Sequence, residues 1–132
     1  MSYTHLPSQF PISMPDLATG STYRSAGFFC NGQVVLGVVI KASQALSVRI
    51  AYGTRSDSAA TAGVDTSAAL PFKTAATTFA SSTGTEGGTY HELAVPASAR
   101  VLQLVVANSS GSTVSGATID AGLRVVAFPG GV

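Results

Sequence analysis

Hydrophobic and polar residues alternate with a period of two along much of the chain after residue 20, which is the side-chain repeat of a β-strand. Residues 46–52 show the pattern most clearly, and residues 119–127 repeat it near the C-terminus. Residues 34–40 and Val101–Ala107 are instead near-continuous apolar runs, which are typical of strands covered on both faces. The pattern therefore predicts well-defined strands, two of them with no side open to water.

Turn-forming residues separate these runs from weaker strand candidates. Asn31-Gly32 is a typical hairpin turn, and residues 81–88 and 108–112 have the Gly, Ser and Asn content of loops. The weaker strand candidates are residues 22–30, 69–73, 77–80 and 89–95. No segment has the period of an amphipathic helix. About eight strands with turns between them predict an all-β, antiparallel β-sandwich, for which we favour a jelly-roll topology over another sandwich.

The first 20 residues follow a different pattern. Pro7, Pro11 and Pro15 recur at intervals of four, which prevents a stable helix and favours extended backbone. We therefore predict an extended N-terminal arm over residues 1–20 and a single β-sandwich domain over residues 21–132. The arm is too apolar for a free linker, so it docks either on its own domain or, as we favour, on a neighbouring subunit. Its candidate interface residues are Leu6, Phe10, Ile12, Met14 and Leu17.

Charge is scarce, and this limits the classes of partner. Charged residues make up 10% of the chain, against a usual fraction of about 25%. The net charge is only +1 and the basic residues are spread singly, so we expect no nucleic-acid partner. A membrane helix would need about 20 consecutive apolar residues, and no run approaches that length, so we also expect no membrane partner. Cys30 is the single cysteine, which excludes an internal disulfide and suits a reducing cytoplasm.

No constellation of residues predicts catalysis or a cofactor. His91 is the one plausible general base outside the arm, but on a strand it lies on the face opposite Tyr90 and Glu92. We therefore expect a non-enzymatic protein, with no catalytic, cofactor-binding or metal-binding residues. Asp57 and Asp65 lie within the long loop over residues 55–69 and could share a calcium ion, but the loop lacks the dense ligand spacing of a calcium loop. Cys30 follows two phenylalanines, so we expect it to be a small buried hydrophobic residue and not a reactive thiol.

Three segments give the chain a resemblance to a known family. They are residues 46–57, 101–111 and 119–126, and the composition rich in Ala, Gly, Ser and Thr accompanies them. With its extended terminal arm, the chain resembles the tailed-bacteriophage capsid decoration (cement) proteins of the jelly-roll type. The resemblance implies no catalytic residue.

The resemblance implies a structural role in a viral particle. Such a protein assembles in the host cytoplasm, self-associates as a dimer or trimer, binds the major capsid protein on the outside of the shell and stabilises it by bridging capsid subunits. The low charge fits close packing against copies and a shell, because charged groups there would be costly to desolvate. The alternatives are another virion β-module, from the tail, neck or fibre tip, or a small carbohydrate-binding or adhesin module.

Overall fold

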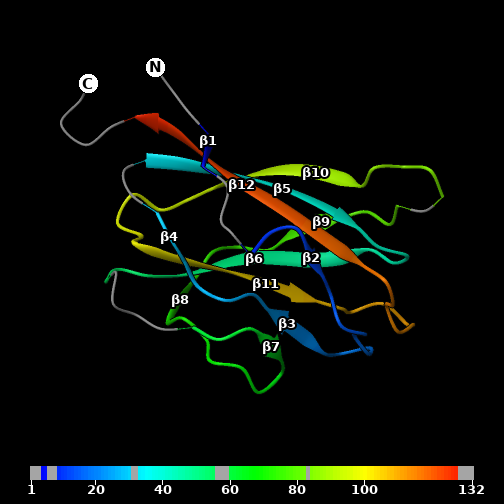
Figure 1. Ribbon diagram of the computed structural model, residues 1–132. Coiled ribbons are helices and arrows are strands. Elements are labelled where there is room, and N and C mark those ends of the chain that lie inside the picture. The colour runs from blue at the N-terminus through cyan, green and yellow to red at the C-terminus, as the bar shows by residue number, and fades with distance from the viewer. Residues whose placement is uncertain (1–3, 6–8, 31–32, 56–59, 83, 128–132) are drawn as a thin grey trace.

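The chain forms two antiparallel β-sheets, seen as two layers in Figure 1. The computed structural model describes residues 4–5, 9–30, 33–55, 60–82 and 84–127, and over these residues it contains strands and loops but no helix. This confirms the predicted all-β, antiparallel architecture, which is that of a β-sandwich.

One layer, called sheet one here, has the order β1–β12–β5–β10, and β2 pairs with the same edge of β12 as β1 does. Every pairing in it is antiparallel. Its strands are β1 (Thr4–His5), β2 (Ile12–Ser13), β5 (Gln33–Lys41), β10 (Thr89–Ala94) and β12 (Thr118–Ala127).

The other layer, sheet two, has the order β7–β3–β11–β6–β8, with β4 paired to β11 and β9 paired to β6. The strong alternation over residues 46–52 became β6, and the apolar run Val101–Ala107 became β11. Its strands are β3 (Thr22–Arg24), β4 (Phe28–Phe29), β6 (Leu46–Gly53), β7 (Gly63–Val64), β8 (Phe72–Lys73), β9 (Thr77–Phe79) and β11 (Val101–Ala107).

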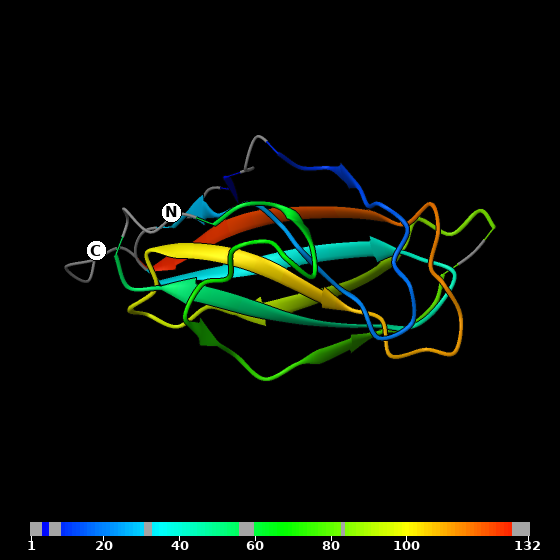
Figure 2. The same cartoon turned by 90° about the horizontal axis from the view of Figure 1, so that it is seen from below.

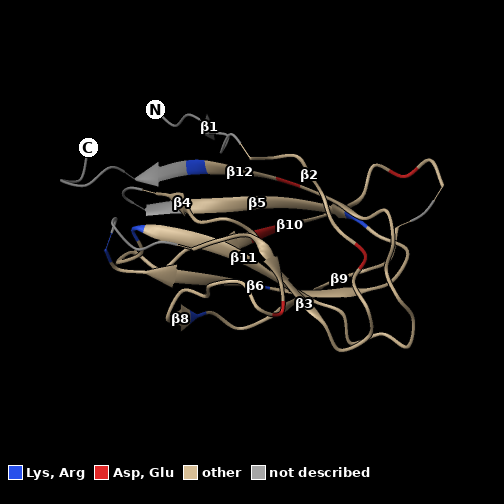
Figure 3. Cartoon of the chain, turned by 60° about the horizontal axis from the view of Figure 1, so that its bottom comes forward, with Lys and Arg blue, Asp and Glu red and all other residues tan. Residues whose placement is uncertain are grey.

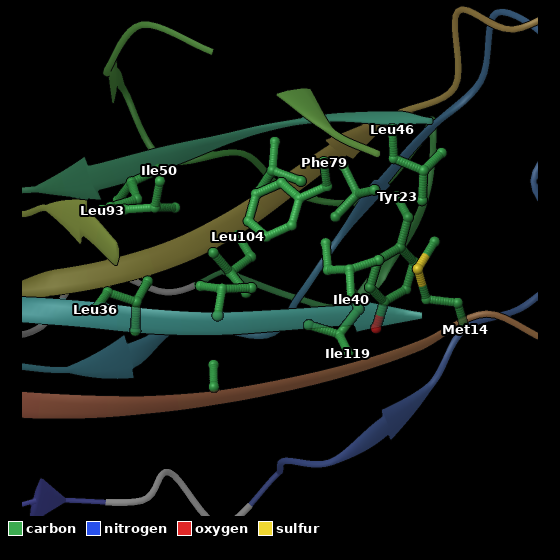
Figure 4. Packing of buried hydrophobic residues seen from close by; sticks show 14 of the residues in the cluster. Met14, Tyr23, Leu36, Ile40, Leu46, Ile50, Phe79, Leu93, Leu104 and Ile119 are labelled. Atoms are coloured by element: carbon green, nitrogen blue, oxygen red, sulfur yellow. The ribbon is translucent and has the colours of Figure 1, made fainter. Parts of the chain in front are cut away.

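The hydrophobic core lies between the two sheets (Figure 4). Because alternate side chains of a strand share a face, β5 sends Leu36, Val38 and Ile40 inward, where each is almost completely buried. Leu104 of β11 and Phe79 of β9 meet them from sheet two and are fully buried. Burial of one such side chain contributes about 1.5–3 kcal/mol, so this layer is the main source of stability.

A buried serine divides the strand predicted over residues 22–30. Ser25 lies between β3 and β4, and its backbone N–H donates to the Leu104 carbonyl at 2.9 Å. Its Oγ accepts from the Leu104 N–H at 2.9 Å. In a regular ladder this N–H would donate to a backbone carbonyl instead. The side chain therefore maintains the pairing with β11 across the irregular residues, and one predicted strand becomes two short ones.

The described part of the arm docks on its own domain. Ile12–Ser13 pairs with the start of β12, and the Leu17 N–H donates to the Val114 carbonyl at 2.8 Å. Met14 and Leu17 are buried in the same core cluster as β5 and β11. The preference for a neighbouring subunit is therefore wrong for these two side chains, because they are already enclosed by their own sandwich.

The two sheets differ on their outer faces. Residues 60–70, nearly all of them in the predicted long loop over residues 55–69, cross the outer face of sheet two, so that Val101 and Val105 of β11 are buried there against Leu70. The prediction that β11 is covered on both faces is confirmed. The same prediction for residues 34–40 is wrong, because Val35 and Val39 of β5 are only half-buried and no segment described in the structure crosses them.

Candidate functional site

The outer face of sheet one is hollowed where β5 lies between β10 and β12. The depression has a volume of about 310 Å³. Gly37 of β5 lies directly opposite Gly122 of β12 in the strand register, so the middle of this face has backbone but no side chain. A floor of two glycines explains why a hollow occurs on a sheet that is otherwise filled with branched side chains. The lining residues are Val35, Gly37, Val39, Tyr90, Glu92, Asp120, Ala121, Gly122 and Arg124.

The strand register brings the polar lining residues around this floor. Tyr90 and Asp120 both pair with Val39, from β10 and β12 respectively. Glu92 pairs with Gly37, and Arg124 lies four residues beyond Asp120 on the same face of β12, opposite Val35. A phenol ring, two carboxylates and a guanidinium therefore border one depression, although they come from strands that are far apart in the sequence.

Tyr90 leans across the centre of the depression. A Cβ atom placed on Gly37 would lie 3.1 Å from the Tyr90 hydroxyl oxygen and 3.3 Å from its Cε1. The end of the ring therefore lies over the Gly37 backbone, in space that any other residue at position 37 would fill. The Tyr90 side chain is nevertheless 56% exposed, which leaves an aromatic surface open to solvent.

His91 lies away from this depression. It pairs with Val38, whose side chain points into the core, and its ring packs edge-on against Phe79 with the ring centroids 4.6 Å apart. The predicted separation of His91 from Tyr90 and Glu92 is therefore confirmed. The contact with a fully buried phenylalanine makes His91 a packing residue at the edge of the sandwich.

The candidate calcium ligands serve a different purpose or lie outside the described residues. Asp65 has a left-handed backbone, with φ of 59°, and its Oδ1 accepts from the Thr22 N–H at 2.9 Å. This carboxylate therefore caps the edge of β3, next to β7. Asp57 lies outside the residues that the structure describes. Within the described ranges, no three metal-ligating side chains form a group that could hold an ion.

Cys30 is buried at the end of sheet two that also contains Arg100. Its Sγ donates to the Ala99 carbonyl at 3.4 Å. Burial raises the pKa of the thiol, and the nearby positive charge of Arg100 partly opposes that increase. This environment fits the predicted role of Cys30 as a small buried hydrophobe, because a reactive cysteine needs a lowered pKa and access to solvent.

The other candidate interface residues of the arm are also partly enclosed. Phe10 and Ile12 pack against the core as half-buried side chains, and the Phe10 ring meets Phe28 edge-on at 5.6 Å. Leu6 lies outside the described residues. Sequence reasoning thus found apolar contact residues, and the structure places four of the five against their own domain.

In comparisons with known proteins, no family model, no curated protein and no solved structure matches the chain. No helix that could cross a membrane occurs among the residues described.

Proposed function

We propose that the protein is a non-enzymatic structural protein of a virion, and that its sandwich is a jelly roll. Support for the topology comes from the strand order. The short strands β1 and β2, β3 and β4, and β8 and β9 each pair with the same neighbour, so each couple represents one interrupted strand. Counting each couple once and leaving out the edge strand β7, sheet one has the chain order 1-8-3-6 and sheet two 2-7-4-5. Two interleaved four-stranded sheets of this kind form a jelly roll.

The proposed role is that of a capsid decoration protein, which binds the outer shell and bridges copies of the major capsid protein. The observation that carries it is a pair of exposed phenylalanines at one end of sheet two. Phe29 is 64% and Phe72 48% exposed. Phe29 pairs with Val101 and so points to the outer face. Phe72 pairs with Tyr52, whose other neighbour is the core residue Leu102, so it points to the inner face at the opposite edge of the same sheet end.

Exposed aromatic side chains on a surface with little charge favour contacts with other proteins. Aromatic residues are enriched and charged residues depleted at the centres of protein interfaces. Figure 3 shows the charged residues as short, separate segments. Those next to the two phenylalanines are basic: Lys73 follows Phe72, and Arg100 precedes Val101, the partner of Phe29. The end of sheet two that contains Phe29 and Phe72 is therefore the surface that we assign to self-association as a dimer or trimer and to shell binding.

The test uses empty shells of the virus that encodes this protein, after the protein has been removed from them. Purified protein should co-sediment with these shells at a fixed stoichiometry, and an averaged image should place it on the capsid surface. The double variant Phe29→Ala/Phe72→Ala should fold normally, because both side chains are exposed, but bind the shells at least about tenfold more weakly. Tyr90→Ala, on the other sheet, is the matched control and should bind as the unaltered protein does. Density at the tail, neck or fibre tip instead would contradict the capsid assignment.

A further inference from the structure

We propose that the depression on the outer face of sheet one binds a pyranose sugar, either neutral or amino-substituted. This inference is independent of the shell-binding role, since it concerns the opposite sheet and can be tested on the isolated protein. It rests on the floor, the aromatic ring and the charges that the strand register brings together.

The floor determines the shape of what fits. Gly37 and Gly122 leave a gap in the side chains beside Val35 and Val39, which flank Gly37 on the same face of β5. The end of the Tyr90 ring covers the Gly37 side of this gap, and the rest opens over Gly122. A flat protein surface laid on this face would leave the gap empty and lose dispersion contacts. A small ring can enter it. The volume of about 310 Å³ is at the lower end of the range for small-molecule sites.

The Tyr90 ring supplies the contact that sugars require. One face of a pyranose ring presents C–H groups, and these pack against the electron-rich face of an aromatic ring. The hydroxyl end of Tyr90 rests over Gly37, and the side chain is 56% exposed, so its aromatic surface is available beside the gap. A purely apolar ligand is disfavoured, because it would have to remove the charged carboxylates of Glu92 and Asp120 from water.

The polar side chains define the class of sugar. Glu92 and Asp120 lie diagonally across β5, because Glu92 pairs with Gly37 and Asp120 with Val39. Two inter-strand spacings and an offset of two residues separate their backbones by about 12 Å. Both carboxylates accept hydrogen bonds from sugar hydroxyl or ammonium groups, and the Arg124 guanidinium donates them. The two negative charges outnumber the one positive charge at this site. Neutral and amino sugars are therefore favoured, and sugar acids are repelled.

The experiment is a titration of the ¹⁵N-labelled protein followed by NMR. The probes are maltotriose, cellotriose, a glucosamine trimer and, as the acidic member, a galacturonic acid trimer. We expect at least one neutral or amino-sugar probe to shift the backbone amide signals of Gly37 and Gly122 in a saturable manner. The galacturonic acid trimer should shift them least. If none of the four probes moves these signals, or if the acidic trimer binds best, the proposal is wrong.

Variants separate binding in the depression from non-specific contact. Tyr90→Ala should weaken binding by about tenfold, whereas Tyr90→Phe retains the ring and should stay within about threefold of the unaltered protein. Gly37→Ala fills the gap and displaces the Tyr90 hydroxyl, so it should also abolish saturation while leaving the fold intact. Phe72→Ala removes a ring of similar exposure from sheet two and is the control, with binding unchanged. Binding that survives both Tyr90→Ala and Gly37→Ala would overturn the assignment.

Discussion

The outer faces of the two sheets differ in whether another segment of the chain covers the central apolar strand. β11 in sheet two and β5 in sheet one are both near-continuous apolar runs. Residues 60–70 cover β11 (Figure 2), whereas Val35 and Val39 on the outer face of β5 are only half-buried. Two strands with the same hydrophobic pattern can therefore have different surroundings, since a pattern does not specify where irregular segments of the chain pass.

A buried amide explains why the covering segment stays on sheet two. Gln103 points outward from β11, is fully buried, and its Nε2 donates to the carbonyls of Ser25 at 3.0 Å and Ala68 at 2.9 Å. Its Oε1 accepts from the Leu70 N–H at 3.2 Å. Sheet one has no such side chain on the described outer face of β5, where Gly37 takes the central position. The arm runs along the edge of sheet one and leaves its face open.

Removing the arm should have the largest effect on stability. Deletion of residues 1–17 takes Met14 and Leu17 out of the core and leaves the Asn108 Nδ2 without its 2.8 Å bond to the Leu17 carbonyl. Losing two large core side chains costs about 5 kcal/mol or more, which is close to the whole stability of many domains. The truncated chain should therefore be unfolded or aggregated by circular dichroism and sedimentation.

Deletion of residues 1–8 is the matched control, because it keeps every arm residue that the structure places in the core. This shorter truncation should melt near the temperature of the full chain. A folded protein after deletion of residues 1–17, with an unchanged melting temperature, would contradict own-domain docking and restore the prediction that the arm docks on a neighbouring subunit.

Gln103→Met should have the next largest effect, because methionine has a similar volume and none of the three hydrogen bonds. The Leu70 N–H and the carbonyls of Ser25 and Ala68 would lose their partner, at a cost of about 2–4 kcal/mol in total. Urea unfolding measures this loss. Val39→Ala on the open face is the control and should cost less than about 1.5 kcal/mol, since that side chain is only half-buried. Equal losses would mean that the two faces are equally important for stability.

Two glycines next to the open face should respond differently to alanine. Gly88 has φ of 121°, and a Cβ there would lie 2.8 Å from Val39 Cγ1 and 3.0 Å from the Ile40 carbonyl oxygen. Gly88→Ala should therefore cost about 1–3 kcal/mol in thermal unfolding. At Gly37 the new Cβ meets only the end of the Tyr90 ring, which can move, so Gly37→Ala should cost less than about 1 kcal/mol. The reverse order would mean that Tyr90 is fixed in place.

Much of the fold could be predicted from hydrophobic alternation, because burial on one side of a strand leaves a period of two in the sequence. The strand expected over residues 89–95 was observed over Thr89–Ala94, and residues 77–80 contain β9. Short strands without alternation, such as β7 within the predicted loop, were not predicted. Pairing with β3 creates β7, and such pairing leaves no burial pattern in the sequence. The docking partner of the arm was predicted wrongly, because the local pattern shows that a segment is apolar but does not identify what it docks on.

The candidate site could be predicted only in part. Alternation placed Tyr90 and Glu92 on one face. Their approach to Asp120 and Arg124 depends on the register of β5 with both neighbours, which no local pattern encodes. The hydrogen bonds of Gln103 could not be predicted for a similar reason. One polar residue in an apolar run does not indicate that its side chain will bind backbone groups of three distant residues.

The smallest expected effect concerns ionisable groups that sheet two buries. Burial raises the pKa of the Cys30 thiol above its ordinary value of 9.0, and burial likewise raises the pKa of the Tyr23 hydroxyl above 10.0. A raised pKa in the folded state adds stability that is fully present below the unfolded value and is lost as the pH rises through the folded value. The free energy of unfolding should therefore decrease above about pH 9, because the unfolded chain releases protons that the folded one retains. Urea unfolding at about pH 7 and pH 10 should show a shallower decrease in Cys30→Ala, and the remaining decrease should diminish in Tyr23→Phe. If both variants lose as much stability between about pH 7 and pH 10 as the unaltered protein does, neither group is buried as the structure describes. Sheet two would then be as open to solvent as sheet one.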